Sequence, residues 1–329
     1  MKRLEYYWYT RNPWLILLLP FAFLYCLVVR LRRLFYRLGL LRSEHLPVPV
    51  IVVGNLTVGG TGKTPLTGWL AVLLKQSGYR PGIIARGYRG QARHWPQQVR
   101  PDSDPVMVGD EAVMLAGMCG CPMAVGPQRV QAARALLKNN ECDVILSDDG
   151  MQHYSLHRDI EIAVIDGVRR MGNGFCLPAG PLREPVSRLE QVDLRVVNGL
   201  GNRGEYPMRM KAGYAHNLAD DNNVRELASF RGDSVHAVAG IGNPERFIEF
   251  LRQAGMRVEA HLFPDHHAYL AGDVCFGDDQ PVLMTGKDAV KCRGFGLQNA
   301  WYVPVTIDMG DDFSARVLEL LGAKNVIAG

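Results

Sequence analysis

Residues 48–65, VPVIVVGNLTVGGTGKTP, decide the fold of this chain. The apolar run 50–53 predicts a buried strand, and the glycine-rich turn after it leads into Gly62-Lys63-Thr64 and a helical segment, 66–74. This is the order of a phosphate-binding loop, whose glycines let backbone N–H groups converge on phosphate oxygens at the positive end of a helix. An ordinary glycine-rich turn is the alternative, but the lysine and threonine in sequence favour nucleotide binding.

The residues of this loop have distinct expected tasks. Lys63 is placed to reach the β- and γ-phosphates, and the Thr64 hydroxyl is placed to ligate Mg²⁺. Thr57 stands where the pattern usually has its first glycine, and the later glycines still supply the flexibility. The predicted cofactor-binding residues are Thr57, Val58, Gly59, Gly60, Thr61, Gly62, Lys63 and Thr64.

Positive charge is concentrated at the beginning of the chain. The net charge is +4, yet residues 1–42 hold eight basic residues and a single acid. The basic residues are Lys2, Arg3, Arg11, Arg30, Arg32, Arg33, Arg37 and Arg42. The remaining body is therefore net acidic, which argues against a nucleic-acid partner. Seven dispersed cysteines without zinc-site spacing are typical of a reduced cytosolic compartment.

The same N-terminal segment predicts a membrane anchor. Residues 14–29 hold no charge and are flanked by arginines, and residues 31–38 place their leucines on one helical face and their arginines off it. Such a segment suits an anionic bilayer surface, in plane or shallowly inserted, since a spanning helix needs roughly 20 apolar residues. A signal peptide is disfavoured because Tyr25-Cys26-Leu27 is not a small-residue cleavage site. A buried core helix is disfavoured by the flanking arginines.

Strand-like and helix-like segments alternate after the loop. They predict an α/β fold of two units, the larger a P-loop NTPase-type, mostly parallel sheet with helices on both faces. Tyr206–Lys211 and Tyr214–Asn217 are expected to pair as a β-ribbon. The predicted organisation is a membrane-anchoring and basic amphipathic segment at 1–42, a P-loop kinase domain at 43–199, a connecting segment at 200–231 and a smaller C-terminal α/β domain at 232–329.

Carboxylates at two places could serve phosphoryl transfer. Asp148-Asp149 ends a predicted buried strand, where a phosphate-loop protein holds Mg²⁺ directly or through water, with helix capping as the alternative. Asp110-Glu111 opens a predicted helix, and capping accounts for this pair equally well. A kinase needs a group that accepts the proton of the attacking hydroxyl, and Asp110 is the candidate. The predicted metal ligands are Thr64, Asp148, Asp149 and Glu111.

Polar residues after other predicted strands are candidates for supporting roles. His266 lies in Asp265-His266-His267 and would orient or polarise Asp110 if the second unit folds over the cleft, whereas a solvated histidine is the alternative. Arg183 and Arg86 could meet phosphate, and Glu184 could meet metal or substrate.

Eight short segments recur together in one family. They are GNLTVGGTGKTP at 54–65, RGY at 86–88, GDE at 109–111, DDGMQH at 148–153, DGVRR at 166–170, LPAGPLRE at 177–184, DH at 265–266 and TGKDAVK at 285–291. In this set and order, across essentially its whole length, the chain resembles the tetraacyldisaccharide 4'-kinases, the lipid A 4'-kinases of Gram-negative bacteria. Ala112 stands where a proline is common in that family.

The resemblance implies transfer of the γ-phosphoryl group of ATP, with Mg²⁺, to the 4'-hydroxyl of a tetraacyldisaccharide 1-phosphate, giving lipid IVA in lipid A biosynthesis. It implies Asp110 as the base, paired with His266 and assisted by Lys63. The implied substrate-binding residues are Arg86, Tyr88, Gln152, His153, Arg183 and Glu184. A lipid with four acyl chains does not readily leave a bilayer, so we expect a monomeric enzyme on the cytoplasmic face of the inner membrane. Its basic segment would meet the 1-phosphate and anionic headgroups.

A membrane-associated P-loop ATPase switch of the partitioning and cell-division type is the alternative function. Such switches usually carry a lysine where this chain has Val58, and their membrane helix tends to be C-terminal. A membrane-docked GTPase would need an Asn-Lys-x-Asp motif, and the nearest segment, TGKD at 285–288, lacks the asparagine.

Overall fold

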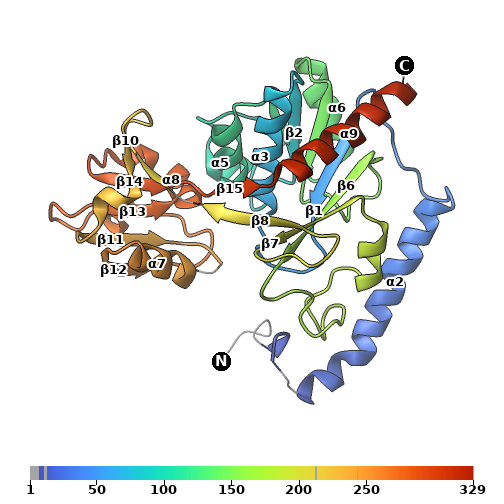
Figure 1. The fold of residues 1–329 in the computed structure, drawn as a ribbon, viewed down its shortest axis with the longest axis horizontal. Helices are drawn as coiled ribbons and strands as arrows, with labels where there is room; N and C mark the ends of the chain where they lie inside the picture. The colour runs from blue at the N-terminus through green and yellow to red at the C-terminus, as the bar shows by residue number, and fades with distance from the viewer. Residues whose placement is uncertain (1–6, 11–12, 212, 243, 329) are drawn as a thin grey trace.

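A computed structural model describes residues 7–10, 13–211, 213–242 and 244–328. Lys2, Arg3 and Arg11 of the predicted basic segment lie outside these residues. In the described part of the chain, a nine-stranded sheet forms the larger body and a six-stranded sheet forms a smaller unit beside it (Figure 1).

The larger sheet has the strand order β15-β8-β7-β6-β1-β5-β2-β4-β3. Its strands are β1 (Val50–Gly54), β2 (Pro81–Ala85), β3 (Gln97–Val99), β4 (Met123–Val125), β5 (Val144–Asp148), β6 (Ile160–Asp166), β7 (Leu194–Asn198), β8 (Tyr206–Lys211) and β15 (Thr306–Met309). The strands from β8 to β4 pair in parallel, and β15 and β3 add antiparallel edges. β1, β2 and β5 are buried along their whole length, as strands covered on both faces must be.

Helices cover both faces of this sheet, which confirms the predicted architecture. On one face, α3 (Lys63–Gln76), α5 (Asp110–Cys119) and α9 (Asp311–Ala328) contribute buried side chains to one core cluster. On the other face, α6 (Arg129–Asn139) packs in a second cluster. The remaining short helices of the body are α4 (Pro105–Val108) and the 3-10 helix η2 (Val186–Gln191). Adjacent residues of β1 enter opposite clusters, Ile51 the first and Val52 the second.

The smaller unit has the strand order β10-β9-β14-β13-β11-β12. Its strands are β9 (Tyr214–Asn217), β10 (Val224–Glu226), β11 (Ser234–Ala239), β12 (Arg257–Leu262), β13 (Val282–Thr285) and β14 (Ala300–Val303). Its helices are α7 (Pro244–Gln253), α8 (Gly286–Cys292) and the 3-10 helices η3 (Leu227–Phe230), η4 (Ala271–Asp273) and η5 (Arg293–Phe295). α7 and α8 contribute to different core clusters of this unit.

The strand pairing corrects two expectations. The predicted ribbon is wrong, because β8 pairs with β7 and β15 in the larger sheet, whereas β9 pairs with β10 and β14 in the smaller one. The end of the chain also returns to the larger body: β15 joins β8, and Phe313, Val317 and Leu321 of α9 are buried in its core. The smaller unit is therefore an insertion between β8 and β15 and does not extend to the C-terminus.

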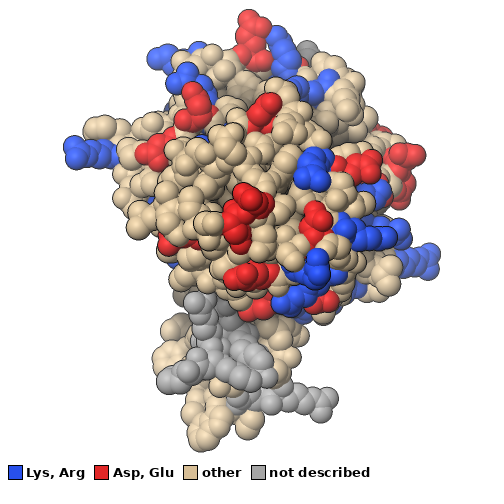
Figure 2. Space-filling model, turned by 90° about the vertical axis from the view of Figure 1, so that its left-hand side faces the viewer, with Lys and Arg blue, Asp and Glu red and all other residues tan. Residues whose placement is uncertain are grey.

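The N-terminal helix stands along the outside of the body (Figure 1). It combines η1 (Pro13–Leu18) with α2 (Leu19–Arg37), and Pro13–Arg37 is long and apolar enough to cross a membrane by length and composition. Only 6% of its most apolar window is buried. In Figure 2 the described residues of the lower projection, at the height of the N-terminal end of α2, are drawn almost entirely in tan, the colour of residues other than Lys, Arg, Asp and Glu.

Candidate functional site

The glycine-rich loop joins β1 to α3 at the carboxyl end of the central strands. Gly62 precedes α3 with φ +100°, and a Cβ there would lie 2.7 Å from Met208 Cε, so this position requires glycine. By contrast, a Cβ at Gly59 or Gly60 would meet nothing within 4 Å. The loop thus presents its backbone to open space, as a cradle for phosphate requires.

The first half of the loop is fixed to the segment 177–184. The Val58 N–H donates to Pro181 O at 2.9 Å, and the Arg183 N–H donates to Leu56 O at 2.6 Å. Thr57 forms a β-bridge with Leu182. Since the Val58 amide is engaged within the protein, the amides free to meet phosphate begin at Gly59.

Asp148 lies at the end of β5, against the first turn of α3. The hydroxyls of Thr64 and Thr67 donate to its two carboxylate oxygens at 3.1 and 3.0 Å. Burial, together with the charges of Asp149 and Glu111, raises the pKa of Asp148 to about 6. A buried carboxylate with this environment lacks a full positive partner, which a bound cation would provide.

Asp149 faces two cations. Its carboxylate lies 3.7 Å from Lys63 Nζ and accepts from Arg183 Nη1 at 3.1 Å. Burial opposes ionisation, but Lys63 and Arg183 outweigh it and hold the pKa of Asp149 below its usual range. The two neighbouring aspartates thus have pKa values pushed in opposite directions.

Asp110 and His266 meet across the two units. His266 Nδ1 lies 2.9 Å from Asp110 Oδ2 and 3.1 Å from Oδ1, and the two side chains are only 9% and 6% exposed. Burial alone would raise the pKa of Asp110, but the hydrogen bond from His266 and the charge of Lys287 lower it. Asp110 is therefore ionised at neutral pH, and its partner is supplied by the inserted unit.

Two lysines of the segment 285–291 complete this cluster. Lys287 Nζ lies 3.2 Å from Glu111 Oε1, 3.0 Å from Asp265 Oδ1 and 3.2 Å from His266 Nε2. Lys291 Nζ lies 3.9 Å from Asp110 Oδ2. Glu111, a predicted metal ligand, is thus paired with a lysine in this structure. Both lysines lie in the segment shared with the family, but nothing in the local sequence indicates this role.

The predicted substrate-binding residues have different environments. Arg86 and Tyr88 are exposed after β2, and the Tyr88 ring centre lies 5.5 Å from that of His266. Burial, with the charges of Arg129 and Arg86, lowers the pKa of His153 to about 4, so this histidine is neutral. Glu184 is buried, and its carboxylate accepts from Gln152 at 3.0 Å and from Tyr154. Its oxygens are therefore occupied by neighbouring side chains.

Arg129 is a further candidate, and no motif of the sequence contains it. It opens α6, is 1% exposed, and donates through Nη1 to Gly126 O at 2.8 Å. Its Nε has no hydrogen-bond partner among the described residues. Burial lowers the pKa of Arg129 to about 10, against the influence of Asp148 and Asp149. No motif marked this arginine, because only the fold brings α6 to the aspartate pair.

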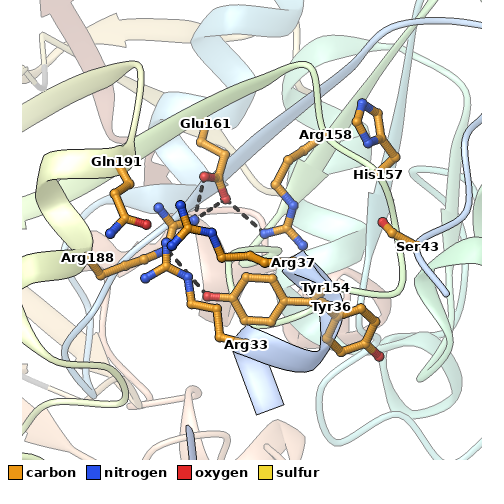
Figure 3. Close-up of a pocket in the computed structure, with 10 residues that line it drawn as sticks. All are labelled: Arg33, Tyr36, Arg37, Ser43, Tyr154, His157, Arg158, Glu161, Arg188 and Gln191. Carbon is orange, nitrogen blue, oxygen red and sulfur yellow. Dashed lines mark hydrogen bonds and ion pairs between the residues drawn. The ribbon is translucent and has the colours of Figure 1, made fainter. Parts of the chain in front are cut away.

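A cavity lies between α2 and the body (Figure 3). It has a volume of about 300 Å³, and its lining includes four arginines and one carboxylate, that of Glu161. These four, Arg33, Arg37, Arg158 and Arg188, define the arginine cavity. Arg158 and Arg188 both bond Glu161, and Arg188 Nη1 is buried without a partner among the described residues. With four cations and one anion, this cavity is suited to an anionic group.

The chain is similar over most of its length to proteins of one kind. A family model described as "Tetraacyldisaccharide-1-P 4'-kinase" matches residues 14–322. The tetraacyldisaccharide 4'-kinase of Nitrosococcus oceani is 55% identical over 96% of this chain and 93% of its own, and that of Alkalilimnicola ehrlichii is 52% identical over 93% and 92%. The crystal structure of LpxK from Aquifex aeolicus in complex with ATP superposes with a TM-score of 0.80 and 28% identity, covering 93% of this chain and 99% of that one. The chain belongs to the tetraacyldisaccharide-1-P 4'-kinase family.

Proposed function

We propose that this chain transfers the γ-phosphoryl group of ATP to the 4'-hydroxyl of a tetraacyldisaccharide 1-phosphate, giving lipid IVA in lipid A biosynthesis. The observation that carries the proposal is the Asp110–His266 pair, at 2.9 Å, in a chain of this family with a complete phosphate-binding loop. The closeness of the pair to the loop supports a single site, because α5, which begins at Asp110, shares a core cluster with α3, which begins at Lys63.

In this mechanism Asp110 is the general base. Ionised Asp110 accepts the proton of the 4'-hydroxyl of the substrate. At the same time the oxygen of that hydroxyl bonds to the γ-phosphorus of ATP, and the bond between the γ-phosphorus and the β–γ bridging oxygen breaks, which releases ADP. His266 holds the carboxylate in place through Nδ1. Lys63 supplies positive charge to the phosphates, and Lys287 fixes Asp265 and His266.

The loop and the aspartates fit MgATP. The open backbone at Gly59 and Gly60 leaves room for phosphates, and Thr64 with Asp148 offers the hard oxygen ligands that Mg²⁺ prefers. Asp149, the next residue along the chain, is a candidate for direct or water-mediated contact with Mg²⁺. Glu111 could contact Mg²⁺ only after its ion pair with Lys287 breaks. When bound, Mg²⁺ would neutralise charge that develops between the β- and γ-phosphates.

The enzyme acts as a monomer at the cytoplasmic face of the inner membrane in this proposal. The exposed apolar side chains of α2 would enter the bilayer, from which the acylated substrate does not readily leave. The arginine cavity beside α2 would then receive the phosphate of the substrate's disaccharide or of an anionic headgroup.

The test is transfer of labelled γ-phosphate from ATP to a tetraacyldisaccharide 1-phosphate in detergent micelles with Mg²⁺. We expect label at the 4'-position with the full chain and loss of most transfer in Lys63→Ala, while the exposed Lys138→Ala serves as the matched control. Hydrolysis of ATP without labelled lipid would instead support the ATPase-switch function. Full turnover by Lys63→Ala would disprove the assigned loop.

A further inference from the structure

The smaller unit holds a cluster of histidine and carboxylate side chains far along the chain from the phosphate loop. His236 lies on β11, and Glu259 and His261 lie two residues apart on the neighbouring β12. In the parallel register His236 is opposite Glu259, and Val238 is opposite His261. Since alternate residues of a strand share a face, all three side chains project from the same face of the sheet.

The ligand atoms of these three residues form a small triangle, in which all of them lie within 4.8 Å of one another. His236 Nδ1 is 3.0 Å from His261 Nε2 and 3.7 Å from Glu259 Oε2, and His261 Nε2 is 3.8 Å from Glu259 Oε1. Two ligands bound to one tetrahedral zinc ion at 2.0–2.1 Å are about 3.3 Å apart. A zinc ion therefore fits this triangle with small side-chain adjustments.

The surroundings prepare His236 as a ligand. Its Nε2 donates to both oxygens of Asp278 at 3.1 Å, which leaves the Nδ1 lone pair directed at His261. A carboxylate that accepts from the second nitrogen of a histidine is a common feature of protein zinc sites. The Phe276 ring stacks on both imidazoles with ring centres 4.1 Å apart, so it fixes both ring planes.

We propose that His236, Glu259 and His261 form a binding site for a divalent cation of the zinc class. Two imidazoles and one carboxylate suit Zn²⁺ or Co²⁺ better than Mg²⁺, which prefers oxygen ligands. The exposed side of Glu259 leaves the fourth position open to water or another ligand. This site is separate from the proposed Mg²⁺ site, which consists of hydroxyl and carboxylate oxygens in the larger body.

The site also joins two strands that lead to the catalytic cluster. β12 continues directly toward Asp265 and His266, and β11 ends before Gly240, whose carbonyl accepts from the His266 N–H at 3.2 Å. A cation that links β11 to β12 would therefore brace the base of the loop that presents His266.

The experiment is titration of the full chain, freed of metal, with Co²⁺ in the presence of excess Mg²⁺. We expect one equivalent to bind with the visible absorption of tetrahedral Co²⁺, and Zn²⁺ to displace it. His261→Gln and Glu259→Gln should weaken binding at least about tenfold, and Asp278→Asn should weaken it by about 10–100-fold through the orientation of His236.

His216→Gln is the matched control, since His216 lies in the same unit and stacks on Tyr302, away from the cluster. Asp148→Asn controls for binding at the phosphate loop. Both should keep the absorption band, and thermal melts in chelator should show that every variant is folded. Absence of the band in the full chain, or a band unchanged in folded His261→Gln, would overturn the proposal in favour of a hydrogen-bonded histidine pair.

Discussion

His266 adopts a backbone conformation that few residues other than glycine use, with φ +64°. This conformation turns its ring from the inserted unit toward Asp110, where Nδ1 meets the carboxylate and Nε2 meets Lys287. Uncommon backbone angles tend to persist where the surroundings fix them and where function uses them. Asp110 and Lys287 hold the His266 ring on both of its nitrogens, which is consistent with a role in positioning the base.

Replacing Asp110 with asparagine tests the base directly. The variant keeps the shape of the side chain but cannot accept the substrate proton, so kcat should fall by about 10²–10⁴-fold while ATP affinity changes little. Steady-state kinetics with varied ATP measure both quantities. Asp279→Asn, at an exposed position, should leave both unchanged. A change confined to KM would make Asp110 a binding residue.

Asp148 should make the nucleotide-free protein more stable in mild acid. Its folded pKa, about 6, lies above the ordinary value of 3.8, so the folded state binds the proton more tightly than the unfolded state. The contribution of Asp148 to the free energy of unfolding therefore falls as the pH rises from about 4 to 6, and it stays low above that range.

Asp148→Asn should accordingly raise the unfolding free energy at pH 8 by on the order of 2–3 kcal/mol, with a gain that vanishes near pH 4. Denaturant titrations at several pH values, without Mg²⁺ or nucleotide, measure the gain. An effect independent of pH would mean that the substitution acts through packing.

Much of the candidate site could be predicted at the level of residues, and some could not. Residues 59–64 carry a local pattern, and Asp148 follows it at the end of a buried strand. The pairing of Asp110 with His266, 156 positions apart, could be expected only from the resemblance and on the condition that the second unit folds over the cleft, because no local pattern joins the two residues. Arg129 and the arginine cavity have no local pattern, because the fold alone gives them their neighbours.

At the scale of elements, the phosphate loop requires the backbone of Gly62. Gly62→Ala would place a Cβ against Met208 and Met210 at φ +100°, so we expect a loss of about 1–3 kcal/mol and weaker ATP binding. Gly117→Ala is the control, since it lies within α5 and its Cβ would meet nothing within 4 Å. That variant should be unchanged or about 0.5–1 kcal/mol more stable in thermal unfolding. Equal effects of the two would contradict the strain argued for Gly62.

The wrong strand pairing also belongs to this scale. β8 and β9 have the composition and spacing of a β-ribbon. Both segments are strands in the structure, as predicted. Their partners were misassigned because pairing is decided by which sheet edges are free nearby. β8 lies beside β7 and β15, and β15 lies more than 90 positions along the chain. Local sequence contains no information about such a partner.

At the scale of the whole molecule, the exposed apolar surface of α2 should determine membrane binding. Phe21, Leu24, Leu27 and Val28 are 52–62% exposed, and burial of one such side chain is worth about 1.5–3 kcal/mol. Changing these four to glutamine, or deleting residues 1–42, should release the protein from vesicles of phosphatidylethanolamine and phosphatidylglycerol in a flotation assay.

The matched control changes exposed apolar residues elsewhere, Val168, Leu200 and Leu270, to glutamine. This variant should float as the unchanged chain does. If the α2 variant floats as well, the membrane-binding surface lies outside this helix.

The insertion of the smaller unit has a consequence for how the protein can be divided. Lys211 and Thr306 are paired residues of the antiparallel strands β8 and β15, so the chain leaves and re-enters the larger sheet at neighbouring points. A two-residue turn joins such a pair in an ordinary β-hairpin. The smaller unit therefore occupies the place of a hairpin loop. Replacing the smaller unit with a tight turn should leave a nucleotide-binding domain that folds on its own, with Asp110 but without His266. Such a shortened protein should still bind ATP but transfer little phosphate, so the two activities could be separated by a single deletion.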